Sequence, residues 1–115
     1  MVERPRMLKI DAEMQRWCAL LEEEVSSWPD VTGRAMFGMR AFYRGATIFA
    51  ALPRTRAMGT PHSIILKLPK ARGEQIALGR GPGAHWASFA LQSADDIPDA
   101  LRWIGRAYDK ARAAR

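Results

Sequence analysis

Hydrophobic residues recur at three- and four-residue spacing after Asp11, which predicts an amphipathic helix near the start of the chain. Asp11 suits the N-cap, because its carboxylate can accept backbone N–H groups of the first turn. Pro29 ends the helix, since it lacks a backbone donor and disfavours helical geometry at the residue before it. The apolar stripe between them consists of Met14, Trp17, Cys18, Leu21, Val25 and Trp28.

From Met36 onward the hydrophobic pattern changes to a period of two, which is typical of strands. Strands are predicted at residues 39–43, 46–52, 63–68 and 86–91, the first two joined by a tight hairpin at Arg44-Gly45. Residues 70–78 are predicted to form a short helix. The run of glycines at residues 79–83 predicts a turn or flexible loop rather than a phosphate-binding loop, because no Gly-Lys-Ser/Thr ending follows.

A closing helix is predicted after Asp95, because acids and Pro98 suit its first turn and Arg106 and Lys110 suit its last turns. Residues 1–10 are expected to form a flexible arm, followed by a single domain at residues 11–115. The order of elements predicts the α+β class. We expect a two-layer sandwich with an antiparallel sheet of about four strands and the N- and C-terminal helices packed on one face.

The two faces of the predicted hairpin differ in character. If Tyr43 pairs with Ala46, one face is apolar and forms the core, while the other carries Arg40, Phe42, Thr47, Phe49 and Ala51. Aromatic rings between cations on an open sheet can stack bases while the cations hold phosphates. The alternatives, which we rank first, are that the glycine-rich loop covers the two rings or that they form the seam of a homodimer.

Charge is unevenly distributed along a chain whose formal net charge is +6. No Asp or Glu occurs between Val31 and Gly73, whereas the segment from Asp11 to Asp30 is acidic. This layout can steer a polyanion to one face. It can also be a solvated basic sheet beside an acidic helix, and we favour that interpretation because a high pI reports mainly on solubility.

No residue pattern indicates catalysis, a metal or a cofactor. Cys18 is the only cysteine, which excludes an intramolecular disulfide, and its place on the apolar stripe predicts a buried thiol. His62 and His85 have no carboxylate at a metal-ligand spacing. No apolar run is long enough to span a membrane and the first residues do not resemble a signal peptide, so a cytoplasmic location is expected.

Short motifs add a family resemblance. Met36-Phe37-Gly38 followed by an aromatic hairpin resembles the start of the TfoX/Sxy N-terminal domain. The run Ile64-Ile65-Leu66-Lys67-Leu68-Pro69, the pair His85-Trp86 and the closing helix are similar to the MmcQ/YjbR family. Together the resemblance covers roughly residues 12–112.

The resemblance implies a compact α-β sandwich rather than a reaction. The TfoX group is associated with regulation of bacterial competence and usually has a second helical domain, which is not found here. MmcQ/YjbR proteins are described as similar to DNA-binding proteins in fold, and neither family implies a catalytic set. The matching positions are expected to be mostly structural, with Gly38 permitting a turn and Trp86 packing across its strand.

These observations predict a non-enzymatic binding or regulatory module, for which a homodimer is one of the open arrangements. The first alternative is a nucleic-acid-binding protein, for which the candidate contact residues are Arg40, Phe42, Arg44, Phe49 and Lys67. The second alternative is a small-molecule or enzymatic site near Lys67, for which the candidates also include His85 and Trp86.

Overall fold

The computed structural model describes residues 7–68, 78–80 and 85–113 of the 115-residue chain. The helices are α1 (Ala12–Ser26) and α2 (Ile97–Ala113), and a short 3₁₀ turn, η2 (Ala94–Asp96), leads into α2. The strands are β1 (Met7–Lys9), β2 (Val31–Met36), β3 (Met39–Arg44), β4 (Thr47–Pro53), β5 (Arg56–Met58), β6 (Ser63–Lys67), β7 (Gly79–Arg80) and β8 (Trp86–Ala90). Within the described residues, no helix is long and apolar enough to cross a membrane.

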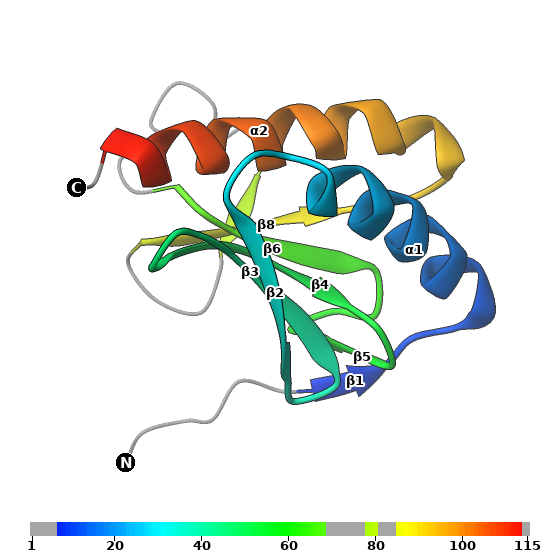
Figure 1. Cartoon of the computed structure of the whole chain (residues 1–115). Helices are drawn as coiled ribbons and strands as arrows, with labels where there is room; N and C mark the ends of the chain where they lie inside the picture. The colour runs from blue at the N-terminus through cyan, green and yellow to red at the C-terminus, as the bar shows by residue number, and fades with distance from the viewer. Residues whose placement is uncertain (1–6, 69–77, 81–84, 114–115) are drawn as a thin grey trace, which may run out of the picture.

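Six strands form one antiparallel sheet in the order β2-β3-β4-β6-β8-β7, and β1 pairs with β5 in a separate two-stranded sheet. Both helices lie on the same face of the six-stranded sheet (Figure 1). The predicted α+β class and the sandwich with both helices on one face are therefore confirmed. The four predicted strands are present as β3, β4, β6 and β8, while β2 and the two-residue β7 extend the sheet at its edges.

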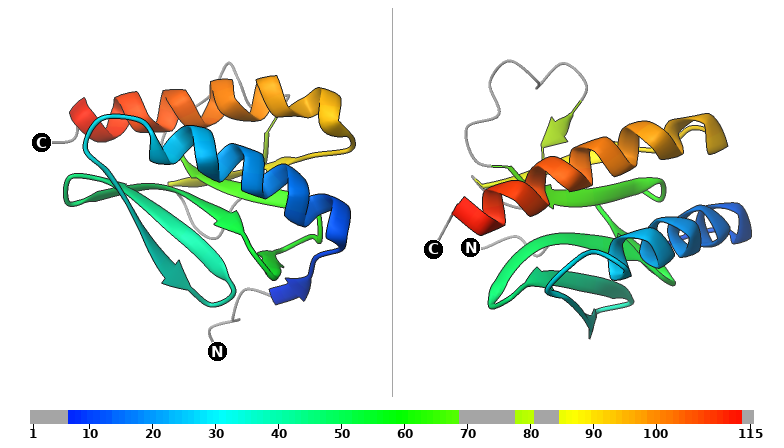
Figure 2. Two further views of the ribbon diagram at one scale, coloured as in Figure 1. Left: turned by 45° about the vertical axis from the view of Figure 1, so that its right-hand side comes forward. Right: turned by 45° about the horizontal axis from the view of Figure 1, so that its top comes forward.

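The helices begin and pack as the sequence pattern indicates. Asp11 caps α1, because its Oδ1 accepts a hydrogen bond from the backbone N–H of Met14 at 2.8 Å. Ser93 and Asp96 form a capping box immediately before α2. The two helices run side by side over the sheet (Figure 2). The residues that α1 buries are Met14, Trp17, Cys18, Leu21 and Val25.

The hydrophobic core is divided by the sheet. The main cluster lies between the sheet and the helices and contains Phe42, Leu66 and Ile104, all 0% exposed. A second, smaller cluster consists of buried Met39, Ala51 and Ile65, with further partly buried side chains packed against it. Because side chains alternate along a strand, Ala51 and its neighbour Leu52 belong to different clusters. We call the face that carries the second cluster the outer face.

The predicted N-terminal arm contains a strand. Met7–Lys9 forms β1, which pairs with β5, and buried Ile10 donates its N–H to the carbonyl oxygen of Thr55 at 3.0 Å. A three-residue strand carries too short a pattern to be found without its partner, which explains why it was not predicted. Residues 1–6 of the arm, most of the helix predicted at 70–78 and residues 81–83 of the glycine-rich loop lie outside the described residues.

Candidate functional site

The aromatic face predicted for the β3–β4 hairpin is not open. Phe42 and Phe49 are each 0% exposed and belong to the main core under the helices. The ring of Phe49 meets the ring of Tyr108 from α2 edge to face, with 5.5 Å between ring centroids. The expectation that these two phenylalanines could stack bases or form a dimer seam is therefore wrong. Residues of α2 cover Phe49.

The observed register differs from the predicted one and contains a β-bulge. Arg44 pairs with Thr47, so the hairpin closes one residue later than the predicted pairing of Tyr43 with Ala46. Tyr43 then lies opposite Ile48 while Phe42 lies opposite Ala50, which leaves Phe49 as an extra residue in β4. The extra residue lets Phe49 and Ala50 both reach the main core, which strict alternation does not allow.

Arg44, another predicted contact residue, instead ties the sheet to α2. Its guanidinium lies 3.8 Å from the centre of the Tyr108 ring and donates a hydrogen bond to the Tyr108 carbonyl oxygen at 3.1 Å. The Tyr108 hydroxyl donates in turn to the Pro29 carbonyl oxygen at 2.8 Å. Arg44 thus has a structural role between β3, α2 and the turn that follows α1.

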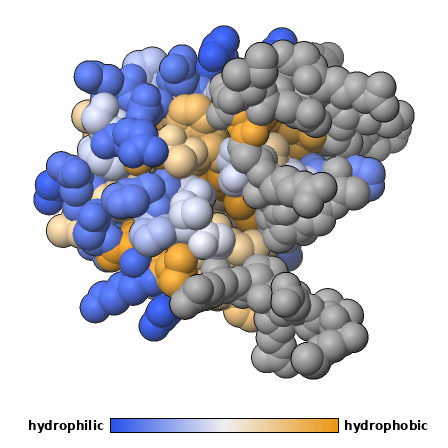
Figure 3. Space-filling view, turned by 180° about the vertical axis from the view of Figure 1, so that it is seen from behind, coloured by the Kyte–Doolittle hydropathy of each residue, from blue (hydrophilic) through white to orange (hydrophobic). Residues whose placement is uncertain are grey.

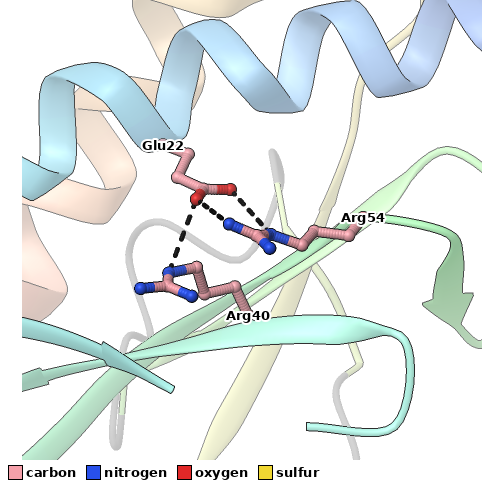
Figure 4. A network of polar contacts seen from close by, with 3 residues as sticks. All are labelled: Glu22, Arg40 and Arg54. Atoms are coloured by element: carbon pink, nitrogen blue, oxygen red, sulfur yellow. Dashed lines mark hydrogen bonds and ion pairs between the residues drawn. The ribbon is translucent and has the colours of Figure 1, made fainter. Parts of the chain in front are cut away.

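Arg40 lies beneath α1 and shares Glu22 with Arg54 (Figure 4). The Arg54 guanidinium binds both carboxylate oxygens, at 2.5 and 3.3 Å, and this hydrogen bonding, followed by the charge of Glu22, raises the pKa of Arg54. Nε of Arg40 is 3.4 Å from Oε1 of Glu22, an ion-pair distance without hydrogen-bond alignment. Gly33 on the neighbouring strand leaves room for the Arg40 guanidinium, because a side chain there would overlap it. Glu22 therefore neutralises part of the basic stretch.

Lys67 and Trp86 are direct cross-strand neighbours on β6 and β8. Trp86 packs against the second cluster together with Met7, Met36 and Met58, and His85 is exposed just before it. The view from behind shows hydrophobic residues among hydrophilic ones on this side of the molecule (Figure 3). The structure thus brings Lys67 and Trp86 together, as the second alternative requires, at an adaptable, methionine-rich cluster.

The turn between β2 and β3, which we call the hairpin tip, consists of Phe37 and Gly38. Both residues have positive φ angles, +48° for Phe37 and +81° for Gly38, as in the two-residue turns that match strand twist. Glycine adopts this conformation without steric cost, whereas phenylalanine does not. The Phe37 side chain is also 80% exposed, so it contributes little to the core.

The hairpin tip is fixed by its backbone. The carbonyl oxygen of Gly38 accepts hydrogen bonds from three successive backbone N–H groups, those of Arg54 (3.0 Å), Thr55 (2.9 Å) and Arg56 (3.2 Å). A Cβ atom on Gly38 would lie 2.9 Å from Oγ1 of Thr55 and 3.1 Å from Cβ of Arg56. These contacts hold the exposed Phe37 beside the segment that joins β4 to β5.

Two cations face each other beside the hairpin tip. Lys9 of β1 and Arg56 of β5 are paired directly across the two-stranded sheet, and both side chains are exposed. Like charges in directly opposite positions destabilise a strand pair. Neither residue makes an ion pair within the part of the chain that the structure describes. We call Phe37 together with Lys9, Arg54 and Arg56 the tip surface.

The remaining candidates for chemistry are Cys18 and the histidines. Burial, followed by the charge of Glu22, raises the pKa of the Cys18 thiol to about 12, so the thiol stays protonated near neutral pH. His62 packs near Trp17, with 6.5 Å between ring centroids. No cluster of three His, Cys, Asp or Glu side chains that could hold a metal ion occurs among the described residues.

Nothing matches the chain among the protein-family models, curated proteins and solved structures with which it was compared. The resemblance to the TfoX/Sxy and MmcQ/YjbR families therefore stays a prediction. Its Met36-Phe37-Gly38 motif contains the hairpin tip, and the expected turn at Gly38 is present. Phe37 departs from the expectation that the matching positions are structural, because its side chain is in solvent.

The sequence pattern missed the tip surface, although one signal for it was present. Phe-Gly occupies a two-residue turn in which Asn-Gly or Asp-Gly is the common choice, so the phenylalanine is unusual there. The juxtaposition of Lys9 with Arg56 depends on a pairing between distant segments and had no local signal.

Proposed function

We propose that this protein is a non-enzymatic binding module whose contact surface is the tip surface. One observation carries the proposal: a phenylalanine occupies a left-handed turn position while its side chain is 80% exposed. The backbone N–H groups of Arg54 and Arg56 donate to the Gly38 carbonyl in the hairpin tip, and Lys9 is the cross-strand neighbour of Arg56. An aromatic ring beside cations supplies groups that bind a ligand by stacking and by charge.

Neither folding nor packing requires phenylalanine at position 37. A side chain other than glycine in the left-handed region costs of order 1 kcal/mol, and asparagine bears this conformation more readily than phenylalanine. Because the Phe37 ring is exposed, its burial offsets little of this conformational cost. Because strain at an exposed residue supports a functional hypothesis, a partner that covers Phe37 accounts for it best.

The other predicted functions have less support. The homodimer and the first nucleic-acid surface both relied on Phe42 and Phe49, which are buried. The small-molecule site relied on Lys67, His85 and Trp86, and the segments that adjoin them in the sequence, residues 69–77 and 81–84, lie outside the described residues. Among the described residues, the tip surface remains as the place where exposure, backbone strain and facing cations coincide.

The substitution Phe37→Asn tests the proposal without knowledge of the partner. If Phe37 serves binding alone, asparagine relieves turn strain and the free energy of unfolding rises. If Phe37 serves the fold, the same variant unfolds at a lower denaturant concentration than the wild type, and the proposal fails.

A further inference from the structure

We infer that the partner of the tip surface is a single-stranded nucleic acid, with one base stacked on Phe37 and the adjoining phosphates held by Lys9 and Arg56. This inference rests on the proposed function and adds the class of ligand to it. Phe37, Lys9 and Arg56 come from three segments that the Gly38 carbonyl and the β1–β5 pairing bring together.

The pairing of Lys9 with Arg56 indicates an anionic ligand. Two cations in directly opposite strand positions repel each other, and the repulsion is relieved when an anion lies between them. Arg56 also donates its backbone N–H to the Gly38 carbonyl at 3.2 Å, which places the start of its side chain next to the hairpin tip. A phosphate bound by this pair therefore lies close to Phe37.

Two acidic side chains, at the N-cap of α1 and within α1, have partners among the described residues. Asp11 Oδ1 accepts the Met14 N–H, and the carboxylate of Glu22 is bound by Arg54 and Arg40. The sequence from Val31 to Gly73 contains no Asp or Glu, so β2 to β6 add only positive charge around the tip surface. Because neither Lys9 nor Arg56 makes an ion pair among the described residues, both can interact with an external anion.

The form of the surface favours a nucleic acid over an acidic polypeptide. A single projecting ring flanked by cations matches the way proteins bind single strands, where aromatic side chains stack on bases and cations follow the backbone. A protein partner requires a broad, well-packed contact area around its anchors. Unpaired bases stack on an exposed ring without first being separated from a duplex, which favours a single strand.

Fluorescence anisotropy with the full chain and labelled mixed-sequence oligonucleotides of about 20 nucleotides, single-stranded DNA and RNA, tests the inference. Phe37→Ala should weaken binding roughly tenfold and leave its salt dependence unchanged, because stacking is not ionic. Phe37→Trp should bind as well as the wild type. Lys9→Ala and Arg56→Ala should each lower the slope of log affinity against log salt by about 0.7, the value for one phosphate contact in a single strand.

Arg102→Ala is the matched control, since it removes one exposed cation from α2, where Arg102 is paired with Asp99 at 3.6 Å. This variant should change neither the affinity nor the slope by a comparable amount. The inference is overturned if no binding occurs at low salt, or if the three tip variants behave like Arg102→Ala. Tighter binding to a duplex, or equal binding to polyglutamate with the same response to the variants, also overturns it.

The inference and the proposed function fail in different experiments. If oligonucleotides do not bind but Phe37→Asn raises the stability of the protein, the ligand class is wrong and the binding module stands. If Phe37→Asn lowers the stability, the role assigned to Phe37 is structural, and both are wrong.

Discussion

The carbonyl oxygen of Gly38 accepts the backbone N–H of Thr55 at 2.9 Å, which joins the hairpin tip to the segment between β4 and β5. A Cβ atom on Gly38 would lie 2.9 Å from the Thr55 hydroxyl oxygen and would also need a φ of +81°. We expect Gly38→Ala to lower the free energy of unfolding by about 2 kcal/mol or more, as measured by urea denaturation.

Gly45→Ala is the control for that prediction. Gly45 also has a positive φ, +59°, but a Cβ atom added there would meet nothing within 4 Å among the described residues. The free energy of unfolding of this variant should fall by about 1 kcal/mol, which is the cost of a side chain in this backbone conformation. Equal losses in the two variants would show that the contact with Thr55 is unimportant.

Glu22 has a stabilising role that opposes binding of an external anion. Glu22→Gln should lower the free energy of unfolding by about 0.5 to 1 kcal/mol, a modest value because the Arg54 side chain is 51% exposed and solvent screens the pair. It should also strengthen oligonucleotide binding, because Arg54, which belongs to the tip surface, is freed from the Glu22 carboxylate. Asp99→Asn, which breaks the exposed pair with Arg102, should change neither the free energy of unfolding nor oligonucleotide binding. Weaker oligonucleotide binding by Glu22→Gln would contradict the account.

Arg44 is predicted to act in the fold rather than in binding. Arg44→Lys keeps the charge but loses the planar group stacked 3.8 Å from the centre of the Tyr108 ring, so the free energy of unfolding should fall by about 1 kcal/mol. Arg34→Lys is the comparison, because exposed Arg34 lies 5.3 Å from the Tyr43 ring and should tolerate lysine. Thermal unfolding of both variants distinguishes them, and equal midpoints would disprove the structural role.

The raised pKa of Cys18 gives a pH dependence of stability. Burial raises the thiol pKa from its usual 9.0 to about 12, so between these values the native state keeps a proton that the unfolded state has lost. Stability from this group is complete below about pH 9 and falls as the pH rises toward 12. Urea denaturation at rising pH should show a steeper fall for the wild type than for Cys18→Ala, and identical slopes would contradict the shift.

Much of the fold followed from local pattern. The stripe from Met14 to Val25, the Asp11 cap and the four central strands depend on residues that are close in sequence, and all are present. The pairing of β1 with β5 was not predictable, because three-residue strands have no recognisable period and their partners are distant. The face assignment failed at Phe42 and Phe49, because both sets of alternating residues in β3 contain apolar side chains. In β4 the bulge also places Phe49 and Ala50 in the same core.

The candidate site was predictable only in its chemistry. An aromatic ring beside cations in the basic stretch was expected, but at Phe42 and Phe49, and the structure exposes Phe37 instead. Of the arginines chosen from the sequence, Arg40 is paired with Glu22 and Arg44 with Tyr108. Sequence pattern indicates which residue types are present, whereas three-dimensional packing decides which of them face solvent.

The most direct test of the central claim, that Phe37 is retained for binding, compares the urea unfolding of the wild type with that of Phe37→Asn. The reciprocal variant Asp30→Phe places phenylalanine at another exposed residue with a positive φ, +63°, and measures what that conformation costs in this protein. The account predicts that Phe37→Asn is more stable by about 1 kcal/mol and that Asp30→Phe is less stable by a similar amount. A Phe37→Asn variant less stable than the wild type would contradict it.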